Sequence, residues 1–200
     1  SFGNDFTAAC GELYLVQPPS SYDELTNKKA AGDYDNITYL ETHRVRFNEA
    51  EISTLGDQNG REISKAFDSN TSSFWASSTV NTQTVKNSII FKFKASTIID
   101  AIVMMPAYST DNGANPKTRR YDGFPTTMKV YTASNNKEFE LHTIFTGTPA
   151  RTDLWDLVQF VFRRQITCDH LKIEFTEVTR DVSFGNDFTA ACGELYLVQP

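Results

Sequence analysis

The sequence predicts an all-β sandwich. From about Glu41 onward, short runs of alternating or continuously apolar residues follow one another, and clusters of turn residues separate them. No amphipathic stretch of about 10–15 residues lies between these runs, which disfavours a parallel sheet with crossover helices. A length of 200 residues suffices for one such domain with a full-sized core.

Each expected strand has its own pattern. Residues 87–94 (NSIIFKFK) alternate apolar and polar side chains, whereas residues 97–105 are continuously apolar. Further strands are expected at 127–131, 138–145, 157–162, 171–175 and 195–198. Turn clusters at 111–113, 134–136 and 184–187 separate them.

The beginning of the chain is less regular. Residues 17–22 (QPPSSY) have the paired prolines and serines of a linker. Residues 19–41 are polar and mixed, and we expect at most a short helix around 22–31. The predicted organisation is the last strand of a preceding identical repeat over 1–18, a linker or N-terminal extension over 19–41 and a β-sandwich over 42–200.

An 18-residue segment occurs twice. Residues 1–18 (SFGNDFTAACGELYLVQP) and 183–200 are identical, at an offset of 182. Either the chain comes from a tandem array of near-identical domains, or a terminal strand was copied to the front. A sandwich of this kind has one place for its last strand, so two copies compete for it. We expect one copy to fill it, and neighbouring units to join end to end or by strand exchange.

Composition excludes several classes of function. The net charge is −6, which argues against nucleic acid as a partner, and the only basic cluster is Lys117, Arg119 and Arg120. No run of about 18 apolar residues is present, so we expect no transmembrane segment. One complete repeat contains two cysteines, Cys168 and Cys192. If their strands form a hairpin, the cysteines lie roughly 20 Å apart, too far for a disulfide, and are simply buried.

One loop is rich in oxygen ligands. Residues 66–77 (AFDSNTSSFWAS) place an Asp, an Asn and several hydroxyl groups within a few positions. Calcium prefers six to eight oxygen ligands, so a distant carboxylate such as Glu194 would have to complete a site. The alternative is an ordinary turn in which Asp68 accepts hydrogen bonds from backbone amides.

The same loop carries a family resemblance. The string Ala66-Phe-Asp-Ser-Asn-x-x-Ser-Phe-Trp75 resembles a loop of galactose-binding-like jelly rolls, the superfamily of coagulation factor 5/8 type C (discoidin) domains and family 32 carbohydrate-binding modules. Residues 89–108, 123–136, 168–175 and 190–198 are similar to later strands of that family, in the same order. The resemblance covers about residues 42–200 and implies a jelly-roll β-sandwich.

The resemblance implies a structural calcium ion. Its ligands would be the Asp68 carboxylate, the Ser73 hydroxyl (a Thr in the family) and the Glu194 carboxylate, completed by backbone carbonyls near Lys65, Asn70 and Ser73. Ser69 stands where the family usually has Gly. Since Glu12 duplicates Glu194, either strand copy could complete the site.

The resemblance also implies glycan binding on loops at one end of the sandwich. Sugar recognition needs aromatic faces and planar polar groups, and two segments offer them. The candidate ligand-binding residues are Tyr108, Asn115, Arg119, Arg120, Tyr121, Phe184 and Asn186, with Arg180 and Phe188 beside them. Pro106-Ala107 replaces the family's Pro-Arg, so one usual sugar contact is missing. The alternatives are a solvated basic loop for the arginines, and packing under the last hairpin or against a neighbouring unit for Phe184 and Phe188.

The other distinctive residues show no catalytic pattern, so we expect that the domain is not an enzyme. We expect Trp75 and Trp155 to be core residues. The histidines His43, His142 and His170 show no metal or triad spacing, and no nucleophile or phosphate-loop motif occurs. Three functions stay open: a calcium-stabilised adhesion module that binds cell-surface or matrix glycans outside the cell, a structural repeat of an extracellular filament or stalk, and an accessory module of a glycan-active enzyme.

Overall fold

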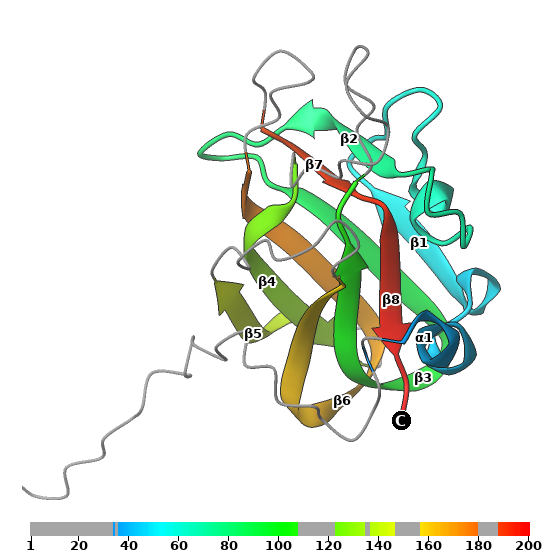
Figure 1. Ribbon diagram of the computed structural model, residues 1–200. Coiled ribbons are helices and arrows are strands. Elements are labelled where there is room, and N and C mark those ends of the chain that lie inside the picture. The colour runs from blue at the N-terminus through cyan, green and yellow to red at the C-terminus, as the bar shows by residue number, and fades with distance from the viewer. Residues whose placement is uncertain (1–33, 35, 108–122, 135–136, 147–156, 180–187) are drawn as a thin grey trace, which may run out of the picture.

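The computed structural model describes residues 34, 36–107, 123–134, 137–146, 157–179 and 188–200. Strands dominate this part of the chain (Figure 1). The strands are β1 (Ala50–Thr54), β2 (Trp75–Val80), β3 (Asn87–Met105), β4 (Pro125–Ala133), β5 (Glu140–Thr146), β6 (Val158–Val178), β7 (Thr189–Cys192) and β8 (Glu194–Val198). The helical elements are α1 (Ile37–His43) and two 3-10 turns, η1 (Phe47–Glu49) and η2 (Ile63–Ala66). No helix in the described ranges is long and apolar enough to cross a bilayer.

All strand pairs are antiparallel, as the sequence predicts for a sandwich. The main sheet has the order β1-β3-β6-β4-β5, and β8 adds to β3. The strands β2 and β7 form a separate pair.

The long strands β3 and β6 run through both layers of the sandwich. The first half of β3 pairs with β1 and with the second half of β6, whereas its second half pairs with β8 and with the first half of β6. Irregular register between Lys92 and Thr97, and again between Ile99 and Ala101, marks the bend. In Figure 1 the red β8, the end of β3 and the start of β6 lie in front of β1, β4 and the remaining halves.

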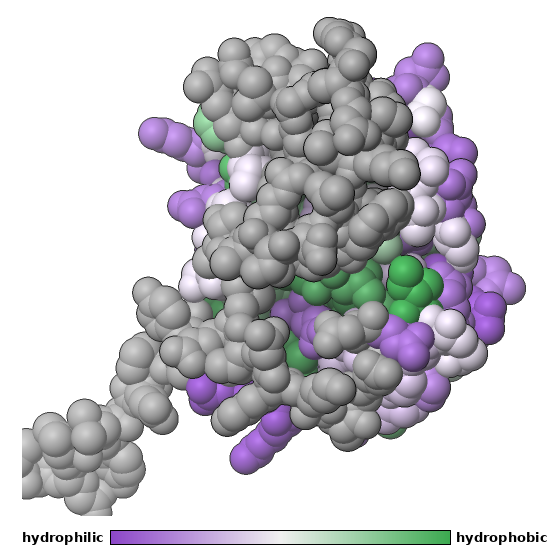
Figure 2. Space-filling model, viewed as in Figure 1, coloured by the Kyte–Doolittle hydropathy of each residue, from purple (hydrophilic) through white to green (hydrophobic). Residues whose placement is uncertain are grey.

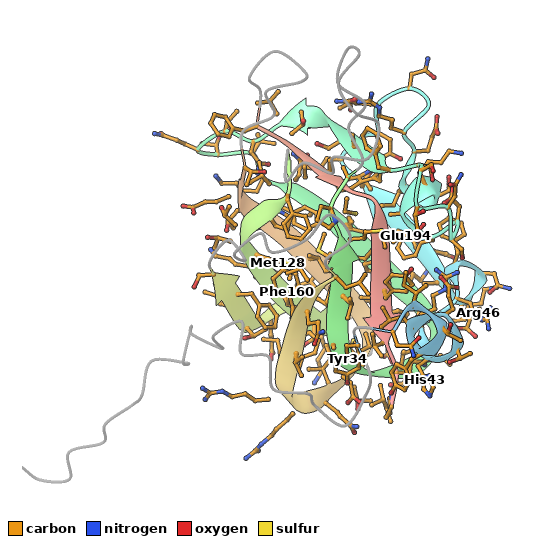
Figure 3. The ribbon with its side chains drawn as sticks, viewed as in Figure 1. Tyr34, His43, Arg46, Met128, Phe160 and Glu194 are labelled. Atoms are coloured by element: carbon orange, nitrogen blue, oxygen red, sulfur yellow. The ribbon has the colours of Figure 1, made fainter. Side chains whose placement is uncertain are left out.

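The main core lies between these two layers. Side chains from nearly every strand meet there, including Met128 of β4 and Phe160 of β6 (Figure 3). Trp75, at 1% exposure, belongs to this core, which confirms its predicted role. Cys168 and Cys192 are both buried free thiols, which confirms the prediction that they are buried. The hairpin premise was wrong, because Cys192 lies in β7, which pairs with β2.

A second apolar cluster lies outside the front layer. Alternate residues of β3 and β8 point outward there, among them Val103, Tyr196 and Val198, and Leu40 of α1 and Tyr34 cover them. Helix α1 begins at Asn36, whose side chain accepts hydrogen bonds from the backbone N–H groups of Thr38 and Tyr39. Because of this cover, every residue of β8 is buried. Figure 2 shows hydrophobic residues in the middle of this face, with hydrophilic residues toward its edge.

Several predicted elements need correction. The runs 87–94 and 97–105 are one strand, β3, because the polar residues between them form a bend and not a turn. The runs 157–162 and 171–175 likewise belong to the single strand β6. The sequence singled out neither α1 nor the short strands β1 and β2, and the closing strand expected over 190–198 is divided at Gly193 into β7 and β8. The helix expected at 22–31 and Trp155 lie outside the described residues.

Gly123 gives a test of how tightly β7 is held. Its φ is +70°, and an added Cβ would lie 2.6 Å from the backbone oxygen of Thr189 in β7. Gly60 has a similar φ of +77°, but nothing lies within 4 Å of its Cβ position. We expect Gly60→Ala to lower the free energy of unfolding by about 1 kcal/mol through backbone strain alone. Gly123→Ala should lower the free energy of unfolding by roughly 1–3 kcal/mol more than Gly60→Ala does, because the backbone of β7 must move. Urea unfolding of both variants measures the difference, and equal losses would contradict this account.

Candidate functional site

The predicted cation loop is anchored at both ends by the core. Phe67, which follows η2, is buried against Phe91, with ring centroids 6.1 Å apart. At the other end the indole N–H of Trp75 donates to Asp57 Oδ1 over 2.9 Å, and Asp57 Oδ2 accepts from the backbone N–H of Ile63 at the start of η2. Asp57 thus fixes η2 and Trp75 relative to each other. It is a structural residue that the sequence analysis did not identify.

The loop itself is a compact set of oxygen atoms around Asp68. The Asp68 carboxylate accepts from the backbone N–H of Asn70 at 2.9 Å and from the Ser73 hydroxyl at 2.9 and 2.8 Å. The Ser73 hydroxyl also lies 3.0 Å from the carbonyl oxygen of Asn70. Ser69 has a left-handed φ of +59°, which explains why glycine is common at this position in the resembling family.

Glu194 brings a second carboxylate to this loop from the start of β8 (Figure 3). The side chain has 0% exposure, and no described donor hydrogen-bonds to either of its oxygens. Burial, and then the nearby Asp68 carboxylate, raise the pKa of Glu194 to about 7. Arg44 opposes this shift, but its Nη1 lies 3.9 Å from Glu194 Oε2, too far for a hydrogen bond. A buried carboxylate without a donor is the kind of group that a cation would satisfy.

Arg44 is the unexpected member of this cluster. It follows α1, and its Nη2 contacts Glu41 Oε2 at 2.9 Å and Ser69 Oγ at 2.8 Å. The guanidinium carbon lies 5.6 Å from the ring centroid of Tyr196. The end of α1 therefore contributes a positive charge beside Glu194. No motif in the sequence marks Arg44, since only the folded chain brings positions 44, 69 and 194 together.

Four of the five residues predicted as calcium ligands are close in space and offer oxygen atoms. Asp68, Asn70 and Ser73 are linked by hydrogen bonds, and Glu194 faces the loop. The contact of Lys65 is made by its ammonium group, which lies 3.8 Å from Asp68 Oδ2. The described ranges contain no group of three or more His, Cys, Asp or Glu residues suited to a metal. A cation here would therefore rely on two carboxylates plus hydroxyl and carbonyl oxygens, a donor set that suits calcium.

The predicted glycan residues lie outside the described residues. These are Tyr108, Asn115, Arg119, Arg120, Tyr121, Phe184 and Asn186, and with them Arg180. The ends of the segments that carry them are described, and they meet. The backbone N–H of Gly123 donates to the carbonyl of Thr179 at 3.2 Å, and that of Thr179 donates to the carbonyl of Phe124 at 2.8 Å. The backbone N–H of Ala191 in β7 donates to the carbonyl of Gly123 at 2.9 Å.

Exposed apolar side chains lie at the same end of the sandwich. Phe188 is 45% exposed, and its carbonyl accepts from the backbone N–H of Asn81, next to the exposed Val80. Val85 is also exposed, and its carbonyl accepts from Thr82 in the same turn. The sequence analysis named Phe188 but not the two valines. Exposed apolar side chains therefore lie at the end of β2, in the turn after it and directly before β7.

Known structures share this architecture. No protein-family model matches the chain, and a search of curated proteins gave no match. Among solved structures, the CBM32-1 and CBM32-2 domains of Clostridium perfringens ZmpB in complex with GalNAc match at 23% identity and a TM-score of 0.63, over 82% of this chain and 38% of that one. The family 32 module of C. perfringens NanJ in complex with galactose matches at 17% identity and a TM-score of 0.54, over 76% and 96%.

A third match helps to define the fold. The domain CBM32-3 from a family 31 glycoside hydrolase of C. perfringens matches at 14% identity and a TM-score of 0.61, over 86% of this chain and 99% of that one. The chain spans only 15%, 38% and 41% of three multidomain ZmpB structures. The predicted all-β jelly roll is therefore confirmed: this chain has the galactose-binding-like β-sandwich fold that is also found in family 32 carbohydrate-binding modules.

Proposed function

We propose that this domain is a non-catalytic carbohydrate-binding module of an extracellular or cell-surface protein. One observation carries the proposal: in a fold shared with sugar-binding modules, the residue that follows one candidate segment is hydrogen-bonded to the residue that precedes the other. The carbonyl of Thr179 and the N–H of Gly123 join these segments directly. This bond between flanking residues supports a shared site formed by the segments 108–122 and 180–187.

The chemistry of these segments suits a glycan. Tyr108, Tyr121 and Phe184 offer faces for the apolar side of a pyranose ring, and Arg119 and Arg120 offer planar donors for neighbouring hydroxyl groups. Asn115 and Asn186 add both donors and acceptors. The titles of the similar modules name GalNAc and galactose as bound sugars, so these two sugars are the first ligands to test.

We propose further that a calcium ion links Glu194 to the loop around Asp68. The supporting observation is the buried carboxylate of Glu194, whose two oxygens lack a donor among the described residues. Asp68, Ser73 and Glu194 would supply side-chain oxygens, and Lys65, Asn70 and Ser73 would supply carbonyls. The ion would neutralise the two facing carboxylates and tie the start of β8 to the loop. Its role in this proposal is structural.

Repetition would raise the strength of weak sugar binding. Individual carbohydrate sites gain avidity when several act on one surface, and the duplicated segment supports a tandem arrangement. Cell-surface or matrix glycans are then the proposed partners, with adhesion as the result.

The arginine pair gives a direct test of the glycan site. We expect the Arg119→Ala/Arg120→Ala variant to bind galactose or GalNAc at least about tenfold more weakly, since losing a hydrogen bond from a charged group costs roughly 1.5–3 kcal/mol. Isothermal titration calorimetry with each sugar measures the affinity.

A second arginine pair provides the matched control. Arg163 and Arg164 are exposed in the middle of β6, near the bend that Figure 1 shows at the bottom of the sandwich. Arg163→Ala/Arg164→Ala removes the same charge and should leave sugar affinity unchanged. Equal losses from the two pairs would indicate a general charge effect, and no binding by the unsubstituted domain would remove the glycan proposal.

The calcium proposal predicts that Glu194→Gln changes stability in opposite directions with and without the ion. In EDTA the folded pKa of Glu194, about 7, lies above its ordinary value of 4.5, so folding favours the protonated form. This contribution to stability is complete below pH 4.5 and is lost as the pH rises through 7. At pH 8 in EDTA, Glu194→Gln should therefore be more stable than the unsubstituted chain, and its advantage should shrink toward pH 5.

With millimolar calcium at pH 8 the order should reverse. The ion stabilises the ionised carboxylate, so the unsubstituted chain should gain thermal stability that Glu194→Gln largely lacks. Differential scanning calorimetry at both pH values measures these shifts. Glu51→Gln, which removes a carboxylate that is 75% exposed on β1, is the matched control and should follow the unsubstituted chain. An unsubstituted chain with the same melting temperature in calcium and in EDTA would contradict the metal site.

A further inference from the structure

The segment β7–β8 is the most completely enclosed part of the described chain. Every residue of Thr189–Cys192 and Glu194–Val198 is buried. In sequence, the same ten residues, TAACGELYLV, recur at 7–16. The place that β7 and β8 occupy in the sandwich is here called the strand slot.

Contacts on both faces and both edges define the strand slot. On its inner face Leu195 and Leu197 enter the main core, and on its outer face Tyr196 and Val198 pack in the second cluster. One edge of β8 pairs with residues 101–105 of β3. The other edge meets the chain after α1, where the backbone N–H of Val45 donates to the carbonyl of Leu197 at 2.9 Å.

The β7 part of the slot is equally specific. It pairs with β2, with Cys192 opposite Trp75 and Ala191 opposite Ala76. The backbone N–H of Ala190 donates to the Ser77 hydroxyl at 3.0 Å, and the backbone N–H of Gly193 donates to the carbonyl of Met105 at 2.7 Å. Only a segment with small residues in these places and large apolar residues in β8 fits the slot. Residues 7–16 meet that requirement at every position.

We propose that residues 7–16 are an alternative occupant of the strand slot of their own chain. Because the two segments are identical, each would make the same contacts with β2, β3, α1 and the core. The contact energy therefore does not discriminate between them, and only the connection to the rest of the chain differs.

The chain that joins residues 7–16 to the rest of the domain is long enough to allow this exchange. Val16 would take the place of Val198, and the chain must then return to Tyr34, which already packs in the same cluster as Val198. The 17 residues between Val16 and Tyr34 can span up to roughly 55 Å, far more than the separation of two residues in one cluster. The present occupant is joined to β6 by the ten residues 179–188. Since the cost of closing a loop rises only slowly with its length, both connections are feasible.

The exchange would give the chain two related forms. In the form described here, residues 189–198 fill the slot. In the other, residues 7–16 fill it, Glu12 stands in the place of Glu194, and the second copy is released. This inference concerns assembly of the sandwich and does not depend on the proposed sugar or calcium site.

Matched substitutions in the full chain test the proposal. Leu197→Asp places a carboxylate at an inward position of the core and should disable the second copy, whereas Leu15→Asp disables the first. We expect L197D to unfold cooperatively in urea at a clearly higher midpoint than the double variant L15D/L197D, because residues 7–16 rescue it. L15D alone should unfold at the same urea midpoint as the unsubstituted chain. The pair L195D and L13D/L195D repeats the comparison at a second inward position.

The cysteines report which copy is in the slot. Cys192 is buried in the slot, and Cys10 is its equivalent in the first copy. After brief alkylation by iodoacetamide, peptide mass spectrometry should find Cys192 protected in the unsubstituted chain. In L197D it should find Cys10 protected and Cys192 modified.

Three results would overturn the proposal. The first is that L197D and L195D are no more stable than their double variants. The second is that Cys192 stays protected in L197D. The third is that rescued L197D elutes as a dimer in size-exclusion chromatography with light scattering, because the rescuing strand would then come from a second chain and not from the same one.

Discussion

The insertion of β7–β8 into the sandwich, with β8 at the edge of the front layer between the main core and the second apolar cluster, is the constraint on which the rest of this structure depends. Its β8 half adds an edge to β3, closes the main core with Leu195 and Leu197, and offers Tyr196 and Val198 to α1. Its β7 half pairs with β2 and is held against Gly123, where a side chain would meet backbone atoms. The loop around Asp68, the chain after α1 and Gly123 all contact this one short segment.

The buried Glu194 is a consequence of that insertion. A carboxylate at the first position of a fully enclosed strand loses its hydration, and a second carboxylate, Asp68, lies opposite it. Arg44 compensates for part of this charge from the outer side, at 3.9 Å. Burying the ionised carboxylate of Glu194 at the start of β8 therefore costs free energy, unless a cation or a proton neutralises it. The charge of Glu194 thus depends on the burial of β8 as well as on the loop around Asp68.

The sequence could predict the features that depend on local pattern. Alternating runs marked β4, β5 and the first half of β3, and the string around Asp68 marked a loop whose oxygens do lie together. The bends of β3 and β6 could not be predicted in this way, because residues such as Lys94 and Ser96 are polar at a bend for the same reason that they are polar in a turn: both are exposed. Arg44 and Asp57 escaped notice because their partners are distant in sequence and become neighbours only after the layers close.

Residues 7–16 and 189–198 are identical in sequence and not merely similar, and this has a physical consequence for which of them fills the strand slot. Two similar strands would differ in contact energy, and the better one would fill the slot in nearly every molecule. Two identical strands have equal contact energy, so the preference between them is set by connection and by order of folding. The copy joined to β6 follows a strand that already belongs to the sandwich, whereas the first copy is joined to α1, which itself needs β8 as a surface. During folding from the unfolded chain, residues 189–198 therefore have the shorter connection to an existing sheet. Under the proposed exchange, that difference, and not the strand itself, would select the form described here.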